Sequence, residues 1–305
     1  MATAGMPPVL VERAPAKVNL TLAVRGRRAD GYHDLESLVV FAAAGDELRF
    51  APGGAGHDLV VRGRGAAAAG PMAQNLVLKA ARLLAERVPG LPGGTFTLIK
   101  RLPVAAGLGG GSSDAAAALR LLARTGGIGR DDGRLMDAAR LTGSDVPVCL
   151  DPQPRFMRGT GHDLGAPLAL RRLPALLVNP GVAVPTPEVF RHLGLTAGDR
   201  LAGDPAAVME PAAPQPRDDL VAMLAASRND LEAPALAMAP VIGVALADLR
   251  AHHSCLLARM SGSGATVFGL FDTCRAAAAA GKAISSRHPG WWVKPTMLGG
   301  GQTPR

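Results

Sequence analysis

The sequence is poor in aromatic residues and cysteines, and it has no long hydrophobic run. Aromatic side chains make up 3% of the 305 residues, so the core is expected to consist of Ala, Leu and Val. Cys149, Cys255 and Cys274 lie far apart, with no CxxC pair and no histidine at metal-ligand spacing. This argues against a disulfide framework or a structural zinc site. Because neither a signal peptide nor a membrane span is predicted, we expect a cytoplasmic protein.

The charge of the chain is basic, with a formal net charge of +8. Such a balance suits a nucleic acid, a membrane surface or a small anionic substrate as partner. The basic side chains are mostly scattered arginines, and no basic run is interleaved with aromatics. We therefore expect neither nucleic acid nor membrane as a partner, and a solvated basic surface is the simpler interpretation.

The amino-terminal half alternates strand and helix patterns. Residues 9–50 contain short apolar runs separated by turn signals, which predicts strands on either side of a loop. The glycine-rich stretch 51–70 predicts a further hairpin. From Asn75, apolar residues recur at helical spacing until the stop signal Pro89-Gly90. A strand then leads into a glycine loop and an Ala/Leu-rich helix.

The carboxy-terminal half has a different character from about residue 165. Residues 195–220 are rich in Ala, Pro and Asp and predict a loop or insertion. A strand, a tight glycine turn and a second strand follow around 255–272, and the tail predicts a helix and then an edge strand at 291–297. The fold class is therefore α+β in two domains, residues 1–165 and 166–305.

The glycine loop that begins at Pro103 is the strongest signal in the chain. Successive glycines let several backbone N–H groups turn toward one anion, and a helix that starts directly afterwards adds its dipole. Ser112, Ser113 and Asp114 stand where N-cap residues are expected. The two hydroxyls suit phosphate oxygens or a hydrated Mg²⁺ ion. The predicted ATP-binding residues of this segment are Pro103, Gly107, Leu108, Gly109, Gly110, Gly111, Ser112 and Ser113.

Two other kinds of glycine loop fit less well. A P-loop needs a lysine after its last glycine, and none follows here. A dinucleotide fingerprint needs a third glycine where this chain has Ser112. A plain tight turn before an Ala-rich helix remains the alternative without a ligand.

The loop resembles the phosphate-binding motif of the GHMP kinases. Within that family, five further segments are similar to the diphosphocytidyl-methylerythritol kinases, and they occur in the same order along the chain. They are APAKVNL at 14–20, GRRADGYHDLESL at 26–38, GSDVPV at 143–148, PTPEVF at 185–190 and MSGSGATVFGLF at 260–271.

The resemblance implies a two-domain GHMP kinase fold with ATP and substrate in the cleft between the domains. It implies transfer of the ATP γ-phosphoryl group to the C2 hydroxyl of diphosphocytidyl-methylerythritol in non-mevalonate isoprenoid biosynthesis. ATP with Mg²⁺ is the expected cofactor, and a small substrate carrying cytidine diphosphate is the expected partner. The oligomeric state stays open.

Two residues are the expected catalytic pair. Asp145 begins an apolar run, and the resemblance makes it the base that takes the hydroxyl proton and contacts substrate. Lys17 and Asn19 fall on one face of a strand. The Lys17 ammonium is expected to pair with Asp145 and to lower the charge barrier, while Asn19 bonds the substrate polyol. The alternatives are a turn-capping Asp and an exposed edge-strand Lys.

The cytosine ring is expected to lie among Tyr32, His33 and Phe190. Tyr32 and Phe190 sandwich the ring in this prediction, and His33 bonds its edge. Tyr32 is the only tyrosine of the chain and falls in a loop. The alternative is an exposed turn with an opportunistic aromatic residue.

The resemblance and the sequence also give expectations for several further residues. The family resemblance implies that Asn75 and Lys100 lie on the ATP side, with a helix N-cap and a strand-end charge as their alternatives. Thr186 is expected to bond substrate. Gly262 and Gly264 are expected to let their turn close against the active site, although a simple hairpin explains them equally.

Two rival functions remain. Another GHMP kinase, such as a homoserine or mevalonate kinase, shares the glycine loop but gives no reason for GYHD and PTPEVF. A non-catalytic nucleotide-binding or RNA-binding protein gives no reason for both Lys17 and Asp145.

Overall fold

The computed structural model describes residues 8–201 and 216–299. These residues form two compact units that are interleaved along the chain. Unit 1 comprises 8–15, 45–104 and 110–151, and unit 2 comprises 16–44, 105–109, 152–201 and 216–299. This division does not coincide with a single boundary near residue 165, because the strands β1 (Leu10–Asn19) and β3 (His33–Pro52) each contribute to both units.

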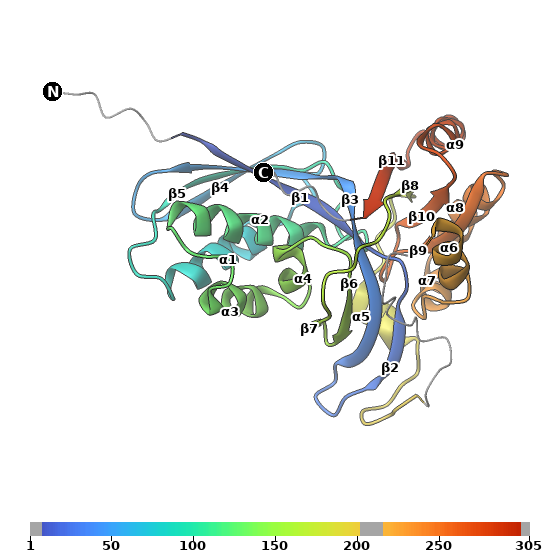
Figure 1. Ribbon diagram of the computed structural model, residues 1–305, viewed down its shortest axis with the longest axis horizontal. Coiled ribbons are helices and arrows are strands. Elements are labelled where there is room, and N and C mark those ends of the chain that lie inside the picture. Colours follow the sequence, from blue (N-terminus) through green and yellow to red (C-terminus); the bar gives the residue numbers. More distant parts are fainter. Residues whose placement is uncertain (1–7, 202–215, 300–305) are drawn as a thin grey trace. The chain divides into compact units, whose positions relative to one another are not determined.

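Unit 1 combines a few strands with a cluster of helices. The second part of β3 pairs antiparallel with β5 (Gly94–Ile99), and β5 pairs parallel with β4 (His57–Arg62). The hairpin predicted for 51–70 is therefore wrong, because β4 pairs with a strand that comes after a helix. The helices of this unit lie side by side in Figure 1: α1 (Leu76–Ala85), α2 (Gly110–Thr125), α3 (Gly133–Thr142) and α4 (Val146–Leu150). The short helix η1 (Met72–Gln74) contacts α1.

Local sequence explains the helices of unit 1. The Asn75 side chain accepts a hydrogen bond of 3.0 Å from the Val77 N–H and so caps α1. Val77, Ala80 and Leu84 are buried on one face of that helix. The small alanines of α2 let α1 and α4 approach it closely, and residues 113–119 are all buried.

Unit 2 contains a largely antiparallel sheet covered by helices. The central strand β8 (Leu173–Asn179) pairs with β10 (Val267–Phe271) and β11 (Trp292–Gly299), and β10 pairs with β9 (Cys255–Met260). Residues 292–297 of β11 have described strand pairing with β8 alone, which fits the edge strand predicted for 291–297, whereas Leu298 and Gly299 also pair with β3.

The remaining elements of unit 2 surround this sheet and the first part of β3. Its smaller strands are β2 (Ala23–Arg27), β6 (Arg155–Gly159) and β7 (Asp163–Leu164). Its helices are α5 (Thr186–Arg191), α6 (Arg217–Ala225), α7 (Glu232–Met238), α8 (Val241–Arg250) and α9 (Cys274–Arg287). The loop predicted for 195–220 ends in α6, and its residues 202–215 lie outside the described part of the chain.

The core is less dependent on small side chains than composition indicated. Ala, Leu and Val are its main components, as predicted, but the largest fully buried side chains are phenylalanines. The rings of Phe50 and Phe96 lie 4.6 Å apart in unit 1. In unit 2, α8 and α9 bury Ala245, Leu246 and Ile284 in the cluster that also contains β8 and β10 residues. The phenylalanines that are almost inaccessible to solvent are Phe41, Phe50, Phe96, Phe156, Phe268 and Phe271.

Candidate active site

The glycine loop has a backbone conformation that few other sequences adopt. Ala105, Gly107 and Gly109 have φ values of 51°, 71° and 58°, which lie in the left-handed region. A Cβ atom on Gly107 would lie 2.4 Å from the Ser261 carbonyl oxygen. Glycine is therefore required at 107 both by backbone conformation and by the close approach of the Ser261 segment.

Neighbouring segments of unit 2 hold this loop. The Lys17 N–H donates to the Leu108 carbonyl oxygen at 2.8 Å, and the Ser261 hydroxyl donates to the Gly107 carbonyl oxygen at 2.9 Å. A Cβ atom on Gly109 would lie 3.1 Å from the Lys17 Cβ. The structure thus brings together three sequence-predicted features: the loop, Lys17 and the turn at 261–264.

Lys17 and Asn19 are both buried on β1, which excludes an exposed edge-strand lysine. The Asn19 amide donates to the Ser37 hydroxyl at 2.7 Å, and the Asn19 N–H donates to the Ser261 hydroxyl at 3.2 Å. Asn19 therefore lies beside the turn, since a Cβ atom on Gly262 would be 3.4 Å from its Oδ1. Part of the hydrogen-bonding capacity of its amide is already used by Ser37.

Asp145 lies at the start of α4 in unit 1, and its side chain makes no capping hydrogen bond to that helix. A side-chain cap of α4 is therefore not observed, and the role of Asp145 as the base stays a prediction. Lys17 belongs to unit 2, and the pairing of Lys17 with Asp145 stays a prediction.

The helix after the glycine loop starts earlier than predicted. It begins at Gly110, so Ser112, Ser113 and Asp114 lie inside the first turns and are not N-caps. Ser113 is buried and donates to the Pro15 carbonyl oxygen at 2.6 Å. Ser112 is half-buried. Of the two hydroxyls, Ser112 is the one that fits a phosphate oxygen or the hydration shell of Mg²⁺.

Lys100 contacts two carboxylates. Its ammonium forms ion pairs with Asp46 of β3 and with Asp114 of α2, the latter at 2.8 Å. All three residues are buried. These pairs use two of the three N–H donors of the Lys100 ammonium, and its place on the ATP side stays a prediction. Sequence reasoning missed Asp46, although an Asp inside the apolar run SLVVFAAAGDELRF is a signal for a paired charge.

Burial has opposite effects on the two kinds of charge in this cluster. Burial and the Asp46 carboxylate raise the pKa of Asp114 and the Lys100 ammonium lowers it, with a net rise to about 7. For Lys100, burial lowers the pKa, but the two carboxylates outweigh it and hold the pKa above its ordinary value. Lys100 therefore stays charged, and Asp114 is the group that titrates near neutral pH.

The predicted cytosine readers partly come together. The His33 and Phe190 rings stack with centroids 4.6 Å apart and an interplanar angle of 25°. Tyr32 is 66% exposed. In this structure His33, and not Tyr32, stacks on Phe190, so one face of the phenyl ring is covered. The His33 Nε2 is buried and has no hydrogen-bond partner, and burial lowers the pKa of this imidazole, with Arg27 adding to the effect.

Two remaining predicted residues have structural partners. Asn75 caps α1, which bears out its alternative, while its place on the ATP side stays a prediction. The Thr186 and Ser263 hydroxyls share a hydrogen bond of 2.7 Å, which ties the start of α5 to the turn at 261–264.

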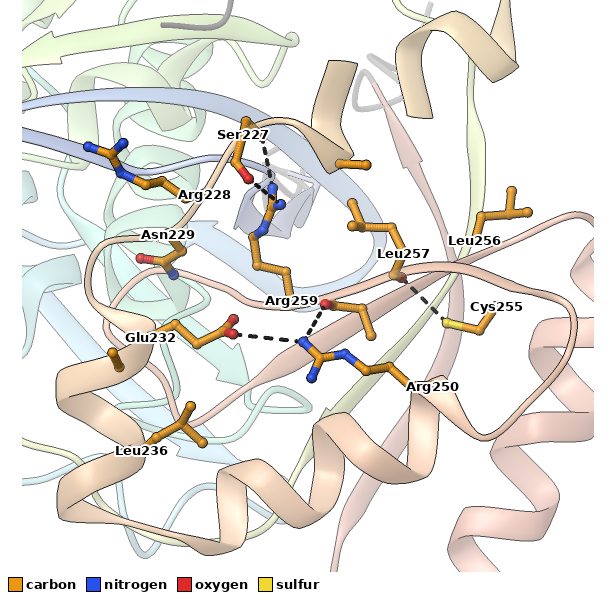
Figure 2. A pocket seen from close by; sticks show the side chains of 13 residues that line it. Ser227, Arg228, Asn229, Glu232, Leu236, Arg250, Cys255, Leu256, Leu257 and Arg259 are labelled. Carbon is orange, nitrogen blue, oxygen red and sulfur yellow. Dashed lines mark hydrogen bonds and ion pairs between the residues drawn. The ribbon is translucent and has the colours of Figure 1, made fainter. Parts of the chain in front are cut away.

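Sequence reasoning also missed the polar network behind this turn. The Asn229 amide donates to the carbonyl oxygens of Met260 and Gly262, at 2.9 and 2.8 Å. Arg259, next to the turn, reaches Ser227, as Figure 2 shows. This network lines a cavity of about 570 Å³. No local pattern distinguishes these residues from surface polar residues, so only the structure reveals them.

In residues 8–201 and 216–299, no group of three or more His, Cys, Asp or Glu side chains could hold a metal ion. No helix in this part of the chain is both long and apolar enough to span a membrane.

Known proteins with similar sequences decide the family. The model of the GHMP kinases N-terminal domain matches residues 75–151, and that of the GHMP kinases C-terminal region matches 210–290. Curated 4-diphosphocytidyl-2-C-methyl-D-erythritol kinases of Methylobacterium radiotolerans and Xanthobacter autotrophicus are 61% and 60% identical to the chain. These matches cover 95% and 94% of this chain, and 99% and 98% of the relatives.

The chain belongs to the GHMP kinase family. A crystal structure of 4-(cytidine 5'-diphospho)-2C-methyl-D-erythritol kinase agrees, with 35% identity and a TM-score of 0.75 over 96% of this chain and all of that chain. The predicted α+β GHMP kinase fold is confirmed, and so is the prediction of a small-molecule kinase. Members of this kinase family use ATP, which fits the conformation of the glycine loop.

Proposed function

We propose that the chain phosphorylates the C2 hydroxyl of 4-diphosphocytidyl-2-C-methyl-D-erythritol with ATP, in non-mevalonate isoprenoid precursor biosynthesis. The relatives at 61% and 60% identity carry the name of that kinase and support the proposal along almost the whole chain. The structural observation that carries it is the left-handed glycine loop held between Lys17 and the turn at 261–264.

In this proposal the loop and the helix after it bind the triphosphate. Backbone N–H groups of Gly107–Gly111 face the phosphate oxygens, and the first turn of α2 adds the positive end of its dipole. Ser112 is the protein hydroxyl that fits the hydration shell of Mg²⁺, because Ser113 already bonds Pro15. Mg²⁺ bound with ATP would neutralise charge that develops on the phosphate oxygens.

The acceptor hydroxyl is activated by Asp145 and Lys17. Asp145 orients the C2 hydroxyl and accepts its proton, and the buried Lys17 ammonium stabilises the negative charge at the transferring group. Asn19 and Thr186 bond the polyol. In this proposal residues 1–165 form the ATP-binding half of the chain and residues 166–305 the substrate-side half.

The cytosine ring is read by Tyr32, His33 and Phe190. The buried His33 Nε2 without a partner supports this role, because a ring edge would satisfy it. His33 covers one face of the Phe190 ring. The cytosine ring would either replace His33 on that face, or bind the opposite face of Phe190 with Tyr32 closing over it. We propose a cytoplasmic enzyme that acts on a small molecule, with no nucleic acid or membrane as partner.

A coupled assay of ADP formation tests the proposal with three alcohols. We expect turnover with 4-diphosphocytidyl-2-C-methyl-D-erythritol and none with mevalonate or homoserine. The His33→Ala variant should raise the KM for the cytidyl substrate, whereas His162→Ala, at an exposed position, should not. Turnover with mevalonate or homoserine alone would keep the kinase and refute the cytosine-reading residues. No turnover in a protein that still binds ATP would favour a non-catalytic nucleotide-binding protein.

A further inference from the structure

Arg27 lies at the end of β2, directly opposite one of the proposed cytosine-reading residues. In the antiparallel register of β2 and β3, Arg27 is the partner of His33. The loop between the two strands carries Tyr32 and is bonded within itself. The Arg28 N–H donates to the Tyr32 carbonyl oxygen at 2.7 Å, and the Asp30 carboxylate accepts from the Tyr32 N–H at 3.1 Å. The hairpin therefore holds the backbone of Tyr32 and of His33 in a defined place relative to Arg27.

A second segment of unit 2 lies along the other edge of β2. The Arg27 N–H donates to the Asp199 carbonyl oxygen at 2.9 Å, and the Gly198 N–H donates to the Arg27 carbonyl oxygen at 2.8 Å. The Leu201 N–H donates to the Arg25 carbonyl oxygen, also at 2.9 Å. The segment thus pairs with β2 on the side that β3 does not occupy.

Gly26 shows how closely this segment approaches β2. A Cβ atom at position 26 would lie 2.3 Å from the Asp199 carbonyl oxygen, so a larger residue would push the two chains apart. The Asp199 side chain also closes the turn that presents this oxygen, because its carboxylate accepts the Thr196 N–H at 2.7 Å. The segment is therefore built to dock against the hairpin.

The same segment continues from α5, the helix that carries Phe190. Leu195, a few residues further along, packs against the hydrophobic core of unit 2. One terminal nitrogen of the Arg27 guanidinium donates to the Leu195 carbonyl oxygen at 2.9 Å. The Nε of Arg27 contacts the Gly31 carbonyl oxygen, next to Tyr32, at 3.4 Å. One guanidinium thus joins the chain beside Tyr32 to the chain that follows Phe190.

We propose that Arg27 is a positioning residue for recognition of the cytosine ring. It holds the hairpin that carries Tyr32 and His33 at a set separation from α5 with Phe190, and this separation defines the space for the base. The inference rests on the proposed function, because it requires these three side chains to bind the base. Arg27 acts through them and does not touch the reacting atoms.

The chemistry of arginine suits this task. A guanidinium has N–H donors in a fixed planar fork, so one side chain can bond carbonyl oxygens on two separate segments. Its charge strengthens these bonds relative to those of a neutral donor. The charge also acts on the partner across the hairpin: burial lowers the pKa of His33, and Arg27 lowers it further. The imidazole of His33 is therefore neutral at neutral pH, as is the base that it meets.

Steady-state kinetics of Arg27→Gln with ATP and the cytidyl substrate varied separately test the proposal. Loss of the bonds to both segments should raise the KM for the cytidyl substrate about tenfold, while kcat and the KM for ATP stay within about twofold of wild type. Arg191→Gln is the matched control, because Arg191 follows Phe190 on α5 but is exposed, and it should change none of these values. An unchanged KM for the cytidyl substrate in folded Arg27→Gln overturns the proposal.

Binding of CDP isolates the cytidine end of the substrate. Calorimetric titration of CDP into the full chain, saturated with a non-hydrolysable ATP analogue, keeps CDP out of the ATP site. We expect the CDP affinity of Arg27→Gln to fall by about the same factor as its KM rises. An unchanged CDP affinity would mean that Arg27 does not act on the base, which contradicts the proposal.

A double variant separates positioning from general support of the fold. If Arg27 acts through His33, then adding Arg27→Gln to His33→Ala should raise the KM for the cytidyl substrate less than Arg27→Gln does in the wild type. A residue that only stabilises the hairpin would give additive effects. Full additivity of the two substitutions therefore counts against the proposal.

The outcomes also separate this inference from the function on which it rests. If Arg27→Gln does not fold, Asp199→Ala replaces it, because Asp199 is exposed and its carboxylate only closes the turn that docks against β2. We then expect a rise of about two- to threefold in the KM for the cytidyl substrate, and an unchanged KM counts against the inference. A wild-type protein that neither turns over the cytidyl substrate nor binds CDP refutes the proposed function, and the inference with it.

Discussion

The two units bury a cation in different ways. In unit 1, Lys100 lies between the carboxylates of Asp46 and Asp114. In unit 2, the described hydrogen bonds of Arg259 all go to neutral oxygens: the Ser227 hydroxyl at 2.9 Å and the carbonyl oxygens of Leu20, Leu224 and Ser227 at 2.9, 2.8 and 2.7 Å. Both cations are nearly inaccessible to solvent.

The difference decides which site responds to pH. Carbonyl and hydroxyl oxygens do not titrate, and a guanidinium keeps its charge even though burial lowers the pKa of Arg259. The Arg259 site is therefore fixed and suits a support behind the turn at 261–264. The Lys100 site contains a carboxyl that exchanges a proton near neutral pH, because burial raises its pKa. Neutral partners thus hold Arg259 in a site whose charges do not change with pH. Two carboxylates around one ammonium make the charge of the Lys100 site depend on pH.

The largest effect is expected from Lys100→Met. This change leaves two buried carboxylates without a counter-charge, and we expect a loss of about 3–5 kcal/mol in the free energy of unfolding. Urea denaturation at pH 7.5 measures it. Lys282→Met, at an exposed position of α9, is the control and should stay within about 0.5 kcal/mol of wild type. A similar small change for both variants would show that the cluster contributes little to stability.

Arg259→Met should have the next largest effect. It removes the Arg259 donors from the carbonyl oxygens of Leu20 and Ser227, whereas the Leu224 oxygen keeps the Ser227 N–H. We expect this to cost about 2–3 kcal/mol. Urea denaturation should give the same loss of unfolding free energy for Arg259→Met at pH 6 and pH 8, whereas the loss for Lys100→Met should depend on pH. Arg191→Met, on the exposed side of α5, provides the control. A marked pH dependence of the loss would contradict the description of Arg259 as a fixed site.

Much of the local structure was predicted from the sequence, for reasons that are visible in particular residues. Helical spacing and a capping Asn75 identified α1, and alternation on β1 placed Lys17 and Asn19 together. The glycine loop was predicted from its residue types. Gly107 and Gly109 have positive φ values, which glycine adopts more readily than other residues, so this conformation is visible in the sequence. Periodicity and backbone requirements are local properties, which explains their success.

Long-range pairing could not be read in this way. β4 pairs parallel with β5 across α1, so its partner is set by packing and not by a nearby turn. The same holds for the Lys100 cluster, whose members lie on three separate elements. In the candidate site, the loop and its motif residues were found, whereas Asp46, Asn229 and Arg259 were not, because their partners are distant in sequence.

A smaller effect is expected from Arg259→Lys, which sharpens the comparison between the two cations. Lysine keeps the charge but cannot reproduce the planar fork of donors, so some of the four acceptors lose their bonds. We expect a loss of about 1–2 kcal/mol in thermal or urea denaturation. A loss equal to that of Arg259→Met would mean that the geometry of the guanidinium donors, and not the positive charge, accounts for the whole contribution of Arg259 to stability.

The smallest effect is a change in the pH dependence of stability caused by Asp114→Asn. The pKa of Asp114 is raised from 3.8 to about 7 in the folded chain, so the folded state holds a proton that the unfolded state has released. This group's share of stability therefore falls as pH rises from about 4 to 7, and by about 1 kcal/mol between pH 6 and 8. Asp114→Asn should remove that decline, as followed by urea denaturation at both pH values. An unchanged decline would place the titrating group elsewhere.

We propose that this GHMP kinase transfers the γ-phosphoryl group of ATP directly to the C2 hydroxyl of the cytidyl substrate, with Asp145 accepting the hydroxyl proton. The most direct test is the rate of ADP formation with 4-diphosphocytidyl-2-C-methyl-D-erythritol in the wild type and in Asp145→Asn, with ATP binding measured in both. We predict turnover by the wild type and a fall in kcat of about 10²–10⁴-fold in the variant, with ATP affinity little changed. Turnover by Asp145→Asn at the wild-type rate would contradict the account.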